Sequence, residues 1–121
     1  MDIEYKYGDF ENIILNAIWY LEENSKPIVS VSDVVNKINE NPEKTWAYTT
    51  VKTVMDRLVK KSLVSRLKQG KKYFYKSRYS RLETGAMHIK KLVMQYYNDN
   101  EKEFIIHAKA LCENSLMKVN V

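Results

Sequence analysis

The chain has 121 residues, 45% of them apolar, which fits one domain, or one domain with a small appendage, with a core of its own. No apolar run approaches the roughly 20 residues that cross a bilayer. The acidic first ten residues lack the apolar stretch of a signal peptide. The single cysteine, Cys112, cannot form an internal disulfide. We therefore expect a cytoplasmic protein with no membrane segment.

The net charge of +5 is concentrated in the middle third of the chain. Residues 46–81 hold eleven Lys or Arg and one acid, Asp56, whereas residues 1–45 carry a net charge of −5 and residues 82–121 are neutral. Because the basic residues are interleaved with apolar ones, this segment can fold and carry its charge on a surface, which a disordered basic tail cannot. A folded, local basic surface is expected of a protein that binds the phosphates of nucleic acid.

Apolar residues at helical spacing predict two helices at the start of the chain. The first has one apolar stripe over residues 10–21 and ends before Pro27, because a proline disfavours helical geometry in the residue before it. A very short strand is expected at 28–29. The capping box at 30–33 then begins a second, short helix, which ends near residues 39–42.

A third helix and a β-hairpin are predicted in the basic segment. The helix begins at about Thr49, and its apolar face comprises Val51, Val54, Met55 and Leu58. The hairpin pairs residues 63–67 with 72–76, and the residues between them include Gly70. The side chains expected to meet DNA are Thr49, Thr50, Lys52, Thr53 and Arg57 on the helix, and Lys68, Lys71 and Lys72 on the hairpin.

This order of elements predicts a mainly α (α+β) fold, a winged helix-turn-helix. A helix about 11 Å in diameter fits the major groove of B-DNA, which is about 12 Å wide. Short threonine side chains let the helix backbone approach the bases, and Lys52 and Arg57 can reach guanine edges or phosphates. The hairpin lysines can lie along the DNA backbone or the minor groove. The expected partner is a double-stranded DNA operator.

Each of these residues also has a purely structural interpretation. The pair Thr49–Thr50 could simply cap the helix, and Arg57 could be a solvated surface residue. Asp56 could pair with Lys52 or Lys60, which lie one helical turn away on either side. The charge segregation and the order of elements together favour DNA binding over these structural interpretations of the single residues.

Two further helices are predicted beyond residue 80. Their apolar residues form a narrow seam in the first helix and a longer stripe over 104–116 in the second. The chain offers little else for these helices to bury against, so we expect a homodimer. The domains are then a winged helix-turn-helix at 1–79 and a helical dimerisation region at 80–121. The interface residues are expected to be Leu82, Ile89, Val93, Tyr96, Phe104 and Leu111.

The sequence WAYTTVKTVMDRLVKK at 46–61, followed by LV at 63–64 and GKKYFY at 70–75, resembles the penicillinase-repressor family, as does ILNAIW at 14–19. The likeness covers about residues 9–78 and is weaker over the C-terminal helices. It implies a homodimeric repressor whose winged domains bind the half-sites of a palindromic operator and whose C-terminal helices form the dimer. By the same resemblance, five residues lie on the recognition helix where it meets the major groove: Thr49, Thr50, Lys52, Thr53 and Arg57.

Three features depart from that family or belong to only some of its members. Where the family has a glycine this chain has Ser62, so either the helix end is less tightly turned or Ser62 adopts left-handed geometry. Copper-responsive members carry a C-terminal cysteine cluster, whereas Cys112 stands alone and is expected to be buried; no metal or cofactor is expected. β-Lactam-responsive members are inactivated by proteolysis, and Asn98–Phe104 lies in about the corresponding place, which makes an inactivating protease a conceivable partner.

No motif predicts an enzyme. His88 and His107 have no second ligand or acid at the spacing of a metal site or catalytic triad, and no glycine-rich phosphate loop is present. Two other functions remain open. One is a winged-helix protein-interaction module that does not bind DNA, which the retained basic face disfavours. The other is a small-molecule-responsive regulator of another winged-helix family, which needs a ligand cavity between the core and the C-terminal helices.

Overall fold

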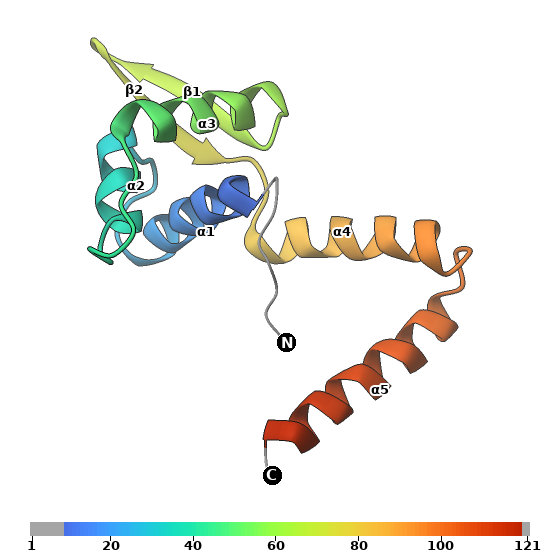
Figure 1. Ribbon diagram of the computed structural model, residues 1–121. Helices are drawn as coiled ribbons and strands as arrows, with labels where there is room; N and C mark the ends of the chain where they lie inside the picture. The colour runs from blue at the N-terminus through green and yellow to red at the C-terminus, as the bar shows by residue number, and fades with distance from the viewer. Residues whose placement is uncertain (1–8, 120–121) are drawn as a thin grey trace. The chain divides into compact units, whose positions relative to one another are not determined.

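The computed structural model describes the backbone of residues 9–119 and the side chains of residues 10–114. They fall into two compact units with a boundary between Arg81 and Leu82. The first unit contains α1 (Asp9–Asn24), α2 (Val31–Ile38), α3 (Tyr48–Lys60), β1 (Val64–Gln69) and β2 (Lys72–Ser77), and the second contains α4 (Arg81–Tyr96) beyond its first residue and α5 (Glu101–Val119). This order of elements confirms the predicted mainly α, winged helix-turn-helix fold (Figure 1).

The capping box predicted at the start of α2 is present. The Ser30 hydroxyl accepts a hydrogen bond from the Asp33 N–H at 3.1 Å, and the Asp33 carboxylate accepts one from the Ser30 N–H at 2.9 Å. Lys26 adds an ion pair to Asp33 at 2.7 Å. Burial raises the pKa of Asp33, but the hydrogen bonds from Lys26 and Ser30 and the charge of Lys26 outweigh burial and hold that pKa below its usual value. These contacts fix the start of a helix only eight residues long.

The hairpin is longer and its turn tighter than the sequence predicts. The strands pair from Val64 opposite Ser77 to Gln69 opposite Lys72, so only two residues form the turn. Gly70, the first of them, has a φ of 65°, and glycine at this position is typical of a II′ hairpin turn. The strand predicted at 28–29 is a single antiparallel bridge, in which Val29 and Tyr75 exchange backbone hydrogen bonds of 2.9 and 2.7 Å.

The core of the first unit lies between the three helices and the base of the hairpin. All four residues predicted for the apolar face of α3 are buried there, and Tyr75 of β2 is also completely buried. Fully burying one such side chain stabilises the fold by about 1.5–3 kcal/mol. The other completely buried side chains include Ile14 and Ile18 of α1, Val29, and Val34 of α2.

Ser62 ends α3 with left-handed backbone geometry, which confirms the second of the two expectations for this residue. Its φ is 62°. The Ser62 N–H donates to the Val59 carbonyl at 3.0 Å, and the Leu63 N–H donates to the Leu58 carbonyl at 3.0 Å. These two bonds form a Schellman motif, which normally places a glycine at this position. The helix end is therefore tightly turned even though Ser62 has a Cβ.

In the second unit a short turn joins α4 to α5. Asn98 and Asp99 have φ values of 50° and 61°, and the Asp99 N–H donates to the Val93 carbonyl at 3.2 Å. Asn100 begins α5, because its side-chain oxygen accepts the Glu103 N–H at 3.1 Å. No helix within the described residues is long and apolar enough to cross a membrane.

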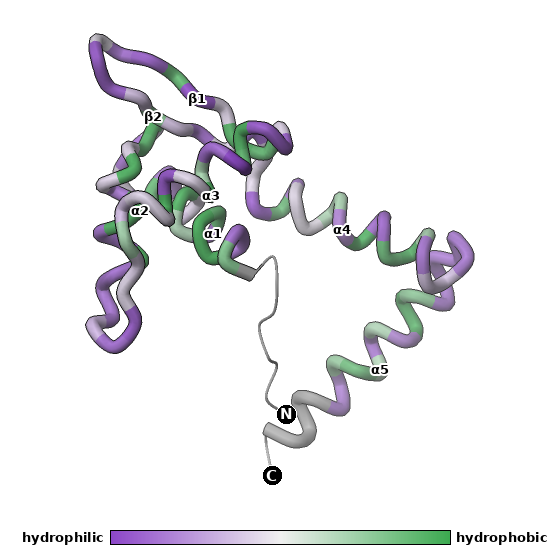
Figure 2. Tube along the Cα trace, turned by 45° about the horizontal axis from the view of Figure 1, so that its top comes forward, coloured by the Kyte–Doolittle hydropathy of each residue, from purple (hydrophilic) through white to green (hydrophobic). Residues whose placement is uncertain are grey.

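Large apolar side chains are exposed along both helices of the second unit, and Figure 2 shows hydrophobic stretches along each. Val93 differs because it is buried, with 5% of its surface exposed. The expectation that Cys112 is buried is wrong, since its position on α5 leaves it exposed in this chain. The largest exposed fractions are those of Leu82 at 84%, Tyr96 at 76% and Ile106 at 70%.

Candidate nucleic-acid interface

The structure places all eight predicted DNA-binding side chains at exposed positions on α3 and the hairpin. Because the apolar face of α3 is buried in the core, the opposite face of the helix is left open to solvent. The hairpin extends away from the helices and is strongly hydrophilic at its tip (Figures 1 and 2). The eight side chains are Thr49, Thr50, Lys52, Thr53, Arg57, Lys68, Lys71 and Lys72.

The threonines at the start of α3 do not cap it. The capping position is held by Ala47, which makes no side-chain hydrogen bond, and the helix begins at Tyr48. The Thr53 hydroxyl donates to the Thr49 carbonyl at 2.8 Å, so its hydrogen is used within the helix. The Thr53 oxygen can still accept a hydrogen bond, and its methyl group can contact a thymine methyl.

Asp56 is engaged by three neighbours. Its Oδ2 atom lies 2.8 Å from Lys52 Nζ, which is one of the two partners that helical spacing allowed. Its Oδ1 atom accepts a hydrogen bond from the Tyr75 hydroxyl at 2.9 Å and lies 3.5 Å from Arg66 Nη1. Asp56 thus connects α3 with both strands of the hairpin.

These contacts shift the pKa values of two groups in opposite directions. Burial and the hydrogen bond to Asp56 raise the pKa of Tyr75 to about 12. For Asp56 itself burial raises the pKa, but the hydrogen bonds from Lys52 and Tyr75 and the charges of Lys52 and Arg66 outweigh burial and lower it. Asp56 is therefore held ionised and Tyr75 neutral near pH 7.

Arg57 is drawn toward α1 by an acid that the sequence pattern did not single out. Its Nη1 atom lies 3.9 Å from Glu11 Oε1, and Lys61 Nζ lies 2.9 Å from the same oxygen. The partners are about 50 residues apart in sequence, so no local spacing could have indicated the contact. At 3.9 Å the pair is loose, and Arg57 remains free to turn toward a phosphate.

A groove of about 360 Å³ separates the hairpin from α2 and α3. Three of the predicted lysines meet in it, one from α3 and two from the hairpin. Two exposed tyrosines that sequence reasoning did not single out also line it; Tyr48 directly precedes the threonine pair and Tyr73 directly follows the hairpin lysines. Ammonium groups and phenolic hydroxyls can donate hydrogen bonds to a phosphate. The lining residues include Ser30, Tyr48, Lys52, Lys71, Lys72 and Tyr73.

Tyr73 also holds two cations on the face of the hairpin that is turned toward α3, the face that carries Tyr75. The Arg66 guanidinium carbon lies 4.8 Å from the centre of the Tyr73 ring, and Lys68 Nζ lies 5.6 Å from it. Tyr73 and Lys68 are directly paired across the strands. Such cation–π contacts bring the charges together in spite of their mutual repulsion.

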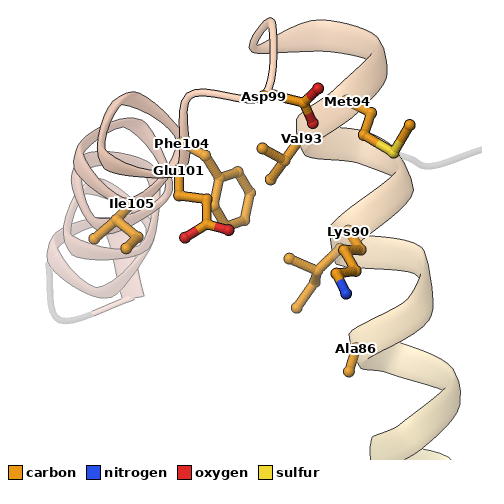
Figure 3. Close-up of a pocket in the computed structure, with 9 residues that line it drawn as sticks. Ala86, Lys90, Val93, Met94, Asp99, Glu101, Phe104 and Ile105 are labelled. Atoms are coloured by element: carbon orange, nitrogen blue, oxygen red, sulfur yellow. The ribbon is translucent and has the colours of Figure 1, made fainter.

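The residues predicted for the dimer interface lie in the second unit, where they differ in exposure. Leu82, Ile89, Tyr96 and Leu111 are exposed, Phe104 is half-buried and Val93 is buried. Figure 3 shows Val93 and Phe104 facing one another at the corner where the helices join. They line a largely apolar hollow of about 510 Å³ within this unit.

The comparisons with known proteins agree with the geometry of the first unit. The sequence model of the penicillinase repressor family matches residues 7–117, nearly the whole chain. No curated protein matches the chain closely enough to count as a relative. The match spans α1 to α3, the hairpin and most of the C-terminal helices. The chain therefore belongs to the penicillinase repressor family of DNA-binding transcriptional repressors.

Proposed function

We propose that this repressor acts as a homodimer on a palindromic operator, with α3 as the recognition helix and the β1–β2 hairpin as the wing. The observation that carries the proposal is the placement of α3. Its apolar face is buried. Its exposed face and three wing lysines belong to the same segment, which carries ten net positive charges. A helix with an exposed polar face beside a basic wing can enter the major groove while the wing holds the backbone.

Base recognition is assigned to the exposed side of α3. Lys52 can donate to guanine O6 and N7 atoms, and the methyl groups of Thr49 and Thr53 can meet thymine methyls. Short side chains near the helix start let the backbone approach the base edges. Arg57, near the other end of the helix, is assigned to phosphate contact because its loose pair with Glu11 leaves it able to turn toward a phosphate.

Phosphate binding is assigned to the wing and to the groove beside it. Lys71 and Lys72 line this groove together with Lys52, and Lys68 is exposed beside Tyr73, which also lines the groove. Phosphate contacts position a protein on DNA without reading sequence, and they make affinity depend on salt. The wing therefore contributes affinity for any duplex, and α3 contributes the preference for one.

Dimerisation is assigned to residues 80–121, and DNA binding to residues 1–79. Single exposed apolar residues are normal on a monomer, but α4 and α5 expose many large ones close together along their lengths. A second copy of the same helices offers a surface that can bury them. Two winged domains joined in this way would bind two symmetric half-sites.

We further propose that proteolysis in Asn98–Phe104 inactivates the repressor. Asn98 and Asp99 are exposed and lie in the turn between the helices, where proteases cleave most readily. Phe104 lies within α5 and is half-buried, which favours cleavage before α5 begins. Cutting here separates α5 from the rest of the chain and weakens the dimer on which tight operator binding depends.

A footprint on the DNA upstream of the protein's own gene tests this function. The wild-type protein is expected to protect two symmetric half-sites whose centres lie about one helical turn, or a multiple of it, apart. Lys52→Ala should abolish protection at concentrations where Lys37→Ala retains it, because Lys37→Ala removes the same charge from the far end of α2. No protected site, or one protected half-site without symmetry, would contradict a dimeric repressor.

A further inference from the structure

Asp56 stands out because it is the only acid in a 36-residue segment with eleven basic residues. A carboxylate on a phosphate-binding face repels phosphates and weakens binding to every duplex. It nevertheless lies between the recognition helix and the wing, with 27% of its side-chain surface exposed. Some gain must offset this loss of affinity.

The position of the carboxylate is fixed from two sides. Tyr75 is completely buried, and its hydroxyl donates to Asp56 Oδ1 at 2.9 Å. Tyr75 is itself held by two backbone hydrogen bonds with Val29. On the other side, Lys52 Nζ lies 2.8 Å from Asp56 Oδ2. The carboxylate cannot swing out to solvent without breaking the hydroxyl contact to the core.

Two cations that could otherwise bind phosphate are thereby occupied. Lys52 is paired closely to Asp56, and Arg66 Nη1 lies 3.5 Å from Asp56 Oδ1. Both cations are about half-exposed, so part of each side chain is open to a ligand that arrives from solvent. A phosphate on a random duplex must replace the carboxylate as their partner, which cancels most of the gain from the contact. A guanine edge can accept hydrogen bonds from the N–H groups of Lys52 that Asp56 does not use. The contact between Lys52 and Asp56 then stays intact.

We propose that Asp56 is a specificity-determining residue, which lowers affinity for random DNA by holding Lys52 and Arg66 while leaving Lys52 oriented for a base edge. This inference rests on the proposed function, because it requires α3 to read a cognate sequence. Discrimination between two ligands often depends on a group that penalises the wrong one. Here the penalised ligand is a phosphate backbone without the cognate bases.

The decisive variant is Asp56→Asn, which removes the charge and keeps an oxygen that can accept the Tyr75 hydroxyl. Each cation released to a phosphate should steepen the slope of log K against log salt by about 0.9 and raise affinity about fivefold at 0.15 M salt. On random duplex both cations contribute. On the cognate duplex Lys52 is already engaged with a base, so the ratio of cognate to random affinity should fall by about fivefold per half-site, or about 25-fold for a dimer that uses both.

A matched control separates this effect from a general change of net charge. Glu40→Gln removes one negative charge from the same unit, at an exposed pair with Lys37 beyond the end of α2. It should leave the ratio of cognate to random affinity unchanged. If Asp56→Asn changes cognate and random affinities by the same factor, as a uniform charge effect would, the inference is overturned.

Two further variants distinguish specificity from a merely structural role. Tyr75→Phe breaks the hydroxyl contact and keeps the charge, so it should lower thermal stability while the affinity ratio stays near the wild-type value. Arg66→Gln should leave the salt slope on random DNA unchanged in the wild-type background, and should flatten it by about one per winged domain in the Asp56→Asn background. A flatter slope for Arg66→Gln alone means that Arg66 already binds phosphate, which refutes the inference even if Asp56→Asn fails to fold.

Failure of this inference differs from failure of the proposed function. A wild-type protein with equal affinity for the footprinted site and for random duplex refutes the proposed function itself. A wild-type protein with a clear preference, combined with an Asp56→Asn variant of unchanged preference, refutes only the role of Asp56.

Discussion

Ser62 occupies a backbone conformation that glycine adopts without a steric penalty. A residue with a Cβ is destabilised by roughly 1–2 kcal/mol in left-handed geometry. Replacing it with glycine removes this cost, but part of the benefit is lost because glycine makes the unfolded chain more flexible. We expect Ser62→Gly to raise the free energy of unfolding by about 0.5–1 kcal/mol in urea titrations. Ser65→Gly, on extended β1, should instead lower it. A destabilised Ser62→Gly variant would show that the Ser62 side chain makes a compensating interaction.

Tyr75 predicts a loss of stability at alkaline pH. Its pKa is raised to about 12, first by burial and then by Asp56, whereas an unfolded tyrosine ionises near pH 10. A raised pKa gives a stabilising contribution that is complete below pH 10 and lost as the pH rises toward 12. Tyr75→Phe should therefore show a flatter decline in the free energy of unfolding above pH 10 than the wild type. Identical declines would mean that Tyr75 does not carry the effect.

Residue positions were predictable from the sequence, but partners that lie on different elements were not. A period of 3.6 residues places Thr49, Lys52 and Thr53 on the side of α3 opposite its apolar face, and the structure exposes them there. The contact between Asp56 and Tyr75 joins residues 19 apart on different elements. Only the folded chain brings such partners together, so local spacing could indicate Lys52 as a partner of Asp56 and could not indicate Tyr75.

The recognition helix and the wing should respond differently to mutation. Lys52→Ala or Thr53→Ala should cost about 1–3 kcal/mol per half-site on the cognate duplex and much less on random DNA, because base contacts carry specificity. Lys71→Ala or Lys72→Ala should weaken binding to both duplexes almost equally and flatten the salt slope by about one for each phosphate that is no longer neutralised. Fluorescence anisotropy titrations at several salt concentrations measure both quantities.

Folding should be unaffected in all four variants, because these side chains are exposed while the core face of α3 is buried. Lys37→Ala serves as the charge control on α2. If the wing variants lose specificity and the helix variants keep it, the assignment of recognition helix and wing is wrong.

Among the elements, helices were predicted more closely than strands. The stripes of apolar residues locate α1, α2 and α3 to within a residue or two, because helical periodicity repeats over several turns. The hairpin turn was expected at 68–71 and comprises only two residues, since strand pairing continues to Gln69. The pattern of a strand does not reveal where its pairing ends; the backbone geometry of Gly70 decides it.

At the scale of the whole molecule, the first unit should survive removal of the second. Its core draws on α1, α2, α3 and the hairpin, with no buried contribution from beyond Arg81 among the described residues. We expect a protein lacking residues 82–121 to stay folded, to be monomeric and to bind DNA weakly. The full chain should sediment as a dimer at tens of micromolar. A monomeric full chain at that concentration would contradict the assignment of α4 and α5 to dimerisation.

The salt dependence of DNA affinity tests the central claim most directly, because it reports sequence preference and the number of phosphate contacts in one titration series. If each winged domain neutralises about four or five phosphates, log K for the dimer on cognate duplex should fall against log salt with a slope of roughly −7 to −9. Affinity for a random duplex should be much lower at every salt concentration. A slope near zero, or equal affinity for the two duplexes, would contradict a repressor that holds DNA through this basic face.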